Sequence, residues 1–281
     1  MLTRRHIRIK VLQILYAYYQ NNCENIVFLE NYLCQSFKDI YIQYYQLLSL
    51  LIEILNIINN NKNIIDQKNI IKLLNNNTHI NKQIINFNIK NDKFLILILI
   101  NDINSSDKYK NYINIDNCVF YVDKSFIKFI INNFFKNSIV LEQNMYEKNM
   151  NWDLDKNIIY TMIINTIDNC YKINKCIFNI ENLENYYKFS KMLYNDTIKN
   201  DNLIESYIDA TLINWDIKRI SFIDKIIVKM AITEIIKYNN IPYKVSINEY
   251  IEISKIFGTP NSNVFVNGII NKIYNKFFNK V

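Results

Sequence analysis

Glycine and proline are almost absent from this chain, and their scarcity restricts what it can fold into. Its 281 residues contain 2 Gly and 2 Pro, whereas ordinary usage is roughly 7% and 5%. All four lie in one C-terminal stretch, at Pro242, Gly258, Pro260 and Gly268. The Gly-rich phosphate loops of dinucleotide- and nucleotide-binding enzymes are therefore missing. An all-β fold would also need more of both residues for its turns.

Neither a metal centre nor a membrane segment is indicated. The five cysteines contain no C-x-x-C pair, and only His6 and His79 could supplement them, whereas a structural zinc site needs four closely spaced ligands. We therefore expect buried thiols, no metal and no cofactor. The longest apolar runs, such as 94–100, are well short of the ~20 residues that span a bilayer, and the N-terminus lacks an export signal. These features predict a cytoplasmic protein.

Hydrophobic periodicity predicts helices along much of the chain. The Asn-rich stretch 59–93 is expected to be broken helix and loop, because Asn side chains compete for backbone hydrogen bonds. A helix over 3–20 would begin with Thr3 as its N-cap. Further helices are expected over 40–58, 94–101, 124–136, 156–171 and 181–199.

The clearest helix signals lie beyond residue 203. Apolar residues recur at helical spacing from Ile220 to Ala231, and that helix should stop at 239–240, because the residue before Pro242 disfavours helical backbone. A final helix after the loop 259–262 is expected to bury one face, formed by Val266, Ile269, Ile270, Ile273 and Phe277.

Between these two helices the sequence predicts specific end signals. Ser246 and Glu249 have the spacing of a capping box, and Gly258 suits the left-handed position after a helix. Gly268 lies inside the final helix, where glycine costs roughly 1 kcal/mol relative to alanine. A close approach by a neighbouring helix or by a ligand would account for it.

The N-terminus is the most suggestive charged segment of a chain whose net charge is +7. Arg4, Arg5, Arg8 and Lys10 precede the first acidic residue, Glu24. Cations at a helix N-terminus cost up to ~1 kcal/mol each, yet free backbone N–H groups and arginine forks can together bind phosphate. The alternative is an ordinary solvated terminus, with the Arg8 stem lying along the edge of the core.

Phe265, at the start of the final helix, is the best candidate for a base contact. An exposed aromatic ring stacks on an unpaired base with about 1–3 kcal/mol, although a peripheral core position is the more frequent role of a Phe. Catalytic groups do not assemble: Asp153 and Asp155 are two residues apart and do not face each other on a helix, and His6 has no neighbouring partner. We therefore expect a binding protein and not an enzyme.

Several segments resemble one known family. They are IPYKVSINE at 241–249, KIFG at 255–258, FVNGIINK at 265–272, DKIIVKMA at 224–231, RRHIR at 4–8 and QILY at 13–16. Together they are similar to the signatures of NusB, a family of transcription antitermination factors, and the similarity over about 215–274 is long and ordered. The resemblance implies an all-α fold of two packed helical subdomains.

The chain is about twice the family's usual length, with the excess between roughly 20 and 200. We expect an enlarged N-terminal helical subdomain over 1–200, which carries the basic first helix, and a NusB-like C-terminal subdomain over 201–281.

The resemblance also implies a function. Such proteins bind boxA RNA of ribosomal RNA leaders together with NusE, a small-subunit ribosomal protein, and join the elongating RNA polymerase complex. Carried over by position, the RNA-binding residues are Arg4, Arg5, Arg8, Asn261 and Phe265. Tyr16 and Asp224 fall near the partner face. The loop after Gly258 often carries acidic residues in the family, whereas here it has none.

Two other functions are considered. NusB-like domains also occur in ribosomal RNA methyltransferases, but that enzyme needs a Gly-containing cofactor loop, which this sequence lacks. A helical adaptor that binds only proteins is the second, and the basic N-terminus argues mildly against it.

Overall fold

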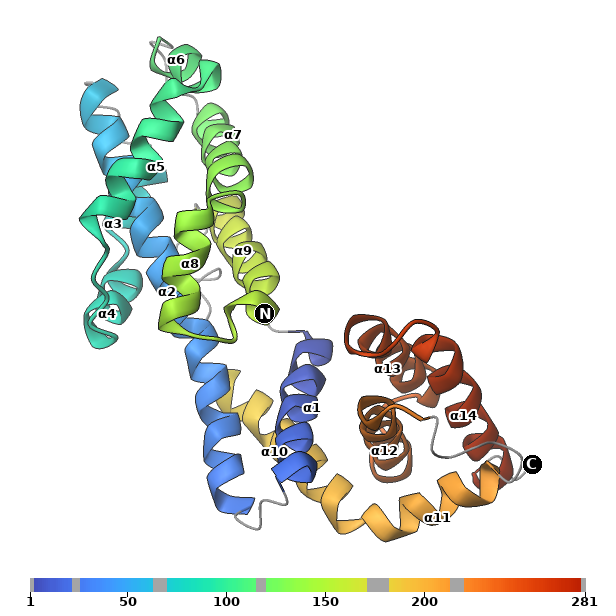
Figure 1. Cartoon of the computed structure of the whole chain (residues 1–281). Coiled ribbons are helices and arrows are strands. Elements are labelled where there is room, and N and C mark those ends of the chain that lie inside the picture. The colour runs from blue at the N-terminus through green and yellow to red at the C-terminus, as the bar shows by residue number, and fades with distance from the viewer. Residues whose placement is uncertain are drawn as a thin grey trace. The chain divides into compact units, whose positions relative to one another are not determined.

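The computed structural model describes residues 3–21, 26–62, 70–114, 120–170, 182–212 and 220–278 (Figure 1). Within these ranges every regular element is a helix, which confirms the expected all-α class. Physically, this follows from long apolar stretches that Gly and Pro do not interrupt.

The chain divides into two compact units. The first, here called the insert unit, is Lys38–Ile180; the second, the composite unit, combines Leu2–Phe37 with Glu181–Val281. This division differs from the expected linear boundary between residues 200 and 201. The reason is that α1 (Arg4–Asn21) and α10 (Asn182–Lys199) both pack against α12 (Phe222–Lys237).

The insert unit contains most of the chain's shorter helices, together with the larger part of α2 (Ile26–Lys62). Asn77, Asp92 and Ser138 cap three of them by accepting hydrogen bonds from the first-turn backbone. The expected broken structure over 59–93 is confirmed where it is described, and 63–69 lies outside the described residues. The elements are α3 (Ile70–Asn75), α4 (Thr78–Asn86), α5 (Lys93–Ser105), α6 (Asp107–Ile113), α7 (Phe120–Ile130), the π-helix η1 (Ile131–Phe135), α8 (Ile139–Lys148) and α9 (Trp152–Asn169).

Helix α2 is longer and more apolar than the sequence runs suggested. Over Val27–Asn60 it is long and apolar enough, by length and composition, to cross a membrane, but 67% of its most apolar window is buried inside the structure. Leu47, Leu51 and Ile54 are fully enclosed. Burial of this kind is typical of a core helix, so we assign α2 to the protein interior.

In the composite unit, α12 is the central helix. It packs against α1, α10, α11 (Asp201–Thr211), α13 (Tyr243–Phe257) and α14 (Ser262–Phe277), as Figure 1 shows. Every residue from Ile226 to Glu234 is buried, as expected for a helix that is covered on all sides. Its polar side chains consequently need internal partners.

The final helix buries the predicted face through Val266, Ile269, Ile270 and Ile273, and only Phe277 is partly exposed. The capping-box prediction, however, is wrong. Helix α13 already begins at Tyr243, so Ser246 lies inside it, and the Ser246 hydroxyl donates to Glu234 across 2.5 Å.

The predicted left-handed conformation of Gly258 is also wrong. Its φ is −83°, and Asn261 adopts the left-handed conformation instead, with φ 73°. Glycine is needed at 258 for space: an added Cβ would lie 2.4 Å from Cβ of Ser262 and 2.6 Å from the carbonyl oxygen of Ser254. The turn between α13 and α14 is therefore tight because two backbone segments meet there.

Candidate nucleic-acid interface

Arg8 lies in the core of the composite unit. Its side chain is 0% exposed, and its Nε and Nη2 donate to the two carboxylate oxygens of Glu234 across 2.8 and 2.5 Å. Ser246 and Tyr250 donate to the same carboxylate. The guanidinium carbon lies 5.7 Å from the ring centroids of Phe189 and Tyr250. This network joins α1, α12 and α13.

The network shifts the pKa values of Arg8 and Tyr250. Burial alone would lower the pKa of Arg8, but the hydrogen bonds and charge of Glu234 raise it above its ordinary value. Burial and the nearby Glu234 carboxylate raise the pKa of Tyr250. Arg8 therefore stays charged and neutralises Glu234. The expectation that Arg8 lies on an RNA-binding surface is wrong; its role is to position α1.

Arg4 and Arg5, in contrast, reach the surface at the start of α1. Arg4 is exposed. The Nε of Arg5 lies 3.0 Å from Glu249 of α13, and its Nη1 lies 3.9 Å from Glu252. Its side chain keeps 36% of its surface exposed. Arg5 is thus oriented by an ion pair at the rim of α13, while Arg4 projects from the first turn.

His6 follows these two arginines on α1 and carries no charge at neutral pH. Burial, together with the positive charges of Lys10 and Arg5, lowers its pKa from 6.5 to about 4. Thr3 caps α1 as predicted, since its hydroxyl oxygen accepts from the backbone N–H of His6 at 3.4 Å. The same hydroxyl lies 2.6 Å from Nδ1 of His6, which fits an unprotonated ring nitrogen.

The start of α14 is attached to the start of α12. The Ser262 hydroxyl donates to Oδ2 of Asp224 across 2.7 Å, and Thr259 lies 3.0 Å from the same hydroxyl. Asp224 is 4% exposed, so it does not belong to an open partner face. It acts as a positioning residue that holds the turn carrying Asn261, whose own side chain is exposed.

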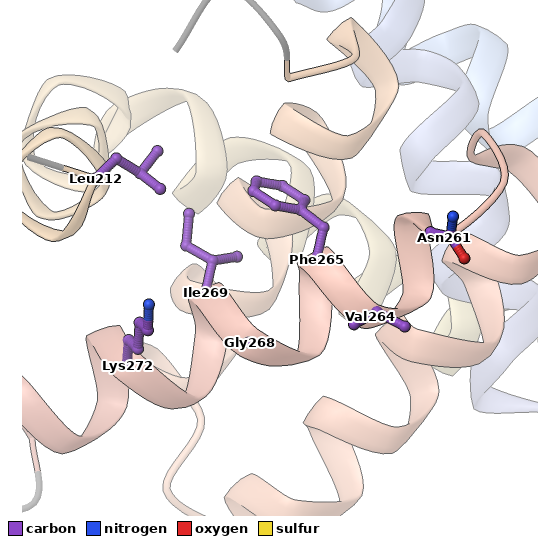
Figure 2. A pocket seen from close by; sticks show the side chains of 7 residues that line it. All are labelled: Leu212, Asn261, Val264, Phe265, Gly268, Ile269 and Lys272. Carbon is purple, nitrogen blue, oxygen red and sulfur yellow. The ribbon is translucent and has the colours of Figure 1, made fainter. Parts of the chain in front are cut away.

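A hollow of about 370 Å³ opens along α14. Figure 2 shows the Phe265 and Ile269 side chains on the side where Leu212 lies, with Asn261 towards one end and Lys272 towards the other. A Cβ added at Gly268 would meet nothing within 4 Å. Close packing of a neighbouring helix therefore does not explain this glycine. Gly268 instead lines the hollow. An apolar floor with polar ends suits a flat ring that carries a phosphate.

Tyr16 of α1 lies beside the first residue of α12, Phe222. Its ring, 42% exposed, meets the ring of Phe222 edge-on with 5.4 Å between the centroids. Sequence reasoning missed Phe222 and Leu212. Phe222 belongs to α12 and Leu212 follows the end of α11, so neither lies on the helix of the motif residue it accompanies. Lys272 ends the segment FVNGIINK, and its spacing of seven residues from Phe265 predicts that both lie on the same helix face.

The thiols and acidic groups suggest no further centre. Cys34 and Cys170 form no disulfide and are partly exposed, so the buried-thiol prediction is wrong for these two. Cys23, Cys118 and Cys176 lie outside the described residues. Across the part of the chain that the structure describes, no three His, Cys, Asp or Glu residues form a group that could hold a metal ion.

Comparison with known proteins gives one match. The model of the NusB family matches residues 157–275. Searches of curated proteins and of solved structures found no match. The matched range includes the central helix α12 and the hydrogen bond between Asp224 and Ser262. It also includes every residue that lines the hollow along α14. Residues 157–275 are thereby identified as a NusB-family region of this chain.

Proposed function

We propose that this protein is an RNA-binding transcription antitermination factor that acts by association and not as an enzyme. The observation that carries the proposal is the open hollow around Phe265, which lies inside the matched NusB region. Its aromatic floor and its lysine suit an unpaired nucleotide, and single-stranded RNA is usually recognised by stacking and edge contacts.

The proposed RNA surface consists of Arg4, Arg5, Asn261 and Phe265. Arg4 and Arg5 supply phosphate contacts, and Arg5 shares its charge between Glu249 and the RNA. Phe265 stacks on a base at the hollow. Each contacted phosphate should contribute about −0.7 to the slope of log K against log salt.

The proposed RNA is boxA of ribosomal RNA leaders, bound together with NusE, and the complex joins elongating RNA polymerase in the cytoplasm. The exposed edge formed by Tyr16 and Phe222 is the proposed partner contact, because paired aromatic rings are frequent anchors of protein interfaces.

The decisive experiment is a fluorescence-anisotropy titration of a short boxA RNA and a scrambled control, with and without NusE, at two salt concentrations. Preferential boxA binding that tightens with NusE and weakens with salt is the expected result. Equal weak binding of both RNAs, regardless of NusE, would instead favour an adaptor that binds proteins alone.

The charge of the α13–α14 turn provides a sharper test. Asn261→Asp should weaken RNA binding, because it adds a negative charge beside the phosphates. Aspartate tolerates the left-handed backbone found at 261, so the turn should keep its shape. Affinity is measured for both proteins across a salt series. Equal affinity at every salt concentration would show that this turn does not touch RNA.

A further inference from the structure

The insert unit has a second hollow, of about 250 Å³, on one side of α7. It is lined by Tyr121, Lys124, Ser125 and Lys128. Their spacing of three, four and seven residues aligns them along one helix face. Tyr121 is 77% exposed, and Ser125 is exposed as well. This group, called here the α7 face, lies outside the residues that match the NusB family.

A single aspartate holds both lysines in place. The Nζ atoms of Lys124 and Lys128 each lie 2.7 Å from Oδ1 of Asp168 on α9. Although burial would raise the pKa of Asp168, the hydrogen bonds and charges of the two lysines lower it below its ordinary value. Two ammonium groups therefore face one ionised carboxylate, and the three side chains together carry one positive charge.

A purely structural role explains only part of this arrangement. Lys124 also donates to the backbone carbonyl of Asp168 across 3.2 Å, and a cation at the end of α9 is favourable there. That role explains neither the second lysine on the same carboxylate nor the exposed ring of Tyr121 beside them. A positively charged hollow next to an open aromatic ring combines the two features that bind single-stranded nucleic acid.

We propose that the α7 face is a second contact site for single-stranded RNA. A base stacks on Tyr121, and the adjacent phosphate accepts hydrogen bonds from Lys128 and Ser125. The inference rests on the proposed RNA-binding function, which it extends to a part of the chain beyond the family match. It predicts that RNA extending past boxA binds more tightly than boxA alone.

The test uses the full chain with two RNAs: a short boxA RNA, and the same RNA extended by unstructured sequence. Tyr121→Ala should weaken binding of the extended RNA about tenfold, equivalent to about 1.4 kcal/mol, whereas Tyr121→Phe should retain affinity. Lys128→Gln should lower the steepness of the salt dependence by about 0.7. None of these variants should change binding of the short RNA.

Lys110→Gln is the matched control. Lys110 is exposed on α6 of the same unit and pairs with Asp107, so its replacement removes an equal charge away from the α7 face. Thermal unfolding of each variant checks that the fold is retained. Photo-crosslinking of extended RNA that carries 4-thiouridine should give an adduct on the α7 peptide containing Tyr121, and Tyr121→Ala should abolish it.

The outcomes separate this inference from the proposed function. If the short RNA binds but the extended RNA gains nothing, or if Lys110→Gln has the same effect as Lys128→Gln, the α7 site is overturned and the proposed function stands. If only the extended RNA binds, and does so through Tyr121, the α7 site stands and the Phe265 surface fails. Binding of neither RNA overturns both. If an acidic peptide displaced the extended RNA as effectively as competing RNA does, RNA would be overturned as the ligand of the α7 face.

Discussion

At the scale of single residues, the two glycines have opposite surroundings. Gly258 lies where the ends of α13 and α14 meet, with no room for a side chain, whereas Gly268 lies on an exposed stretch of α14 beside an open hollow. The same contrast separates the arginines: Arg8 is enclosed and Arg4 is exposed. Residues of one type that lie close together in the sequence therefore have opposite surroundings, and only the exposed ones are available for the proposed RNA contacts.

Alanine at the two glycine positions should change stability in opposite directions. Gly268→Ala should raise the free energy of unfolding by about 0.5–1 kcal/mol, because alanine is the better helix former and nothing blocks its methyl group. Gly258→Ala should lower it by about 1–3 kcal/mol through crowding against Ser262 and Ser254. Urea denaturation measures both. A stability loss in Gly268→Ala would contradict the open environment described for it.

The arginines should separate folding from RNA binding. Arg8→Met leaves the Glu234 carboxyl buried without its cation, so the free energy of unfolding should fall by about 3–5 kcal/mol. Arg4→Gln should leave the unfolding midpoint unchanged and reduce the salt slope of RNA binding by about 0.7. Denaturation and anisotropy titration are measured on both. Weak RNA binding by Arg8→Met at full stability would refute the structural role of Arg8.

At the scale of elements, most helices agree with the periodic patterns, but their ends do not follow from local signals alone. Thr3 caps α1 as predicted, whereas Ser246 and Glu249 are drawn into contacts with Glu234 and Arg5. In α7, the helix widens into η1, and the Tyr160 hydroxyl donates to the carbonyl of Phe135 at its end. Tertiary partners thus decide what a local motif does.

His6, which contacts the N-cap residue Thr3, should make the stability of the protein depend on pH. The pKa of His6 is about 4 in the folded chain and 6.5 ordinarily, so between these values the unfolded chain binds more protons. The free energy of unfolding should therefore fall as the pH is lowered through this window, by about 1–3 kcal/mol, since each pKa unit corresponds to about 1.4 kcal/mol and part of the ring is exposed.

Chemical denaturation over that pH window measures this loss, and His6→Gln provides the control because it cannot titrate. The variant should lose less stability than the parent on acidification. Parallel pH dependence in the two proteins would show that His6 does not contribute.

At the scale of the whole molecule, the family region is completed by residues far away in the sequence. The composite unit joins Leu2–Phe37 to Glu181–Val281, and its central carboxylate, Glu234, is neutralised by Arg8 from the other end of the chain. The match over 157–275 therefore covers only part of what that unit needs to fold.

A fragment of residues 201–281 should consequently fail to fold. It lacks α1 and α10, which cover α12, and it leaves Glu234 without a cation. Circular dichroism and cooperative thermal unfolding are the measurements, with the full chain as the reference. A cooperative transition in the fragment would support a linear boundary near residue 200.

The sequence by itself determined the all-α class, the positions of most helices, the buried face of α14 and the family resemblance of the C-terminal region, because all of these depend on short-range periodicity and contiguous motifs. Only the tertiary structure decided that Arg8 and Asp224 are buried, that Gly258 is needed for space, and that Leu212 completes the hollow beside Phe265. Burial and pairing depend on which helices meet. Residues hundreds of positions apart, such as Arg8 and Glu234, leave no local signal of their contact.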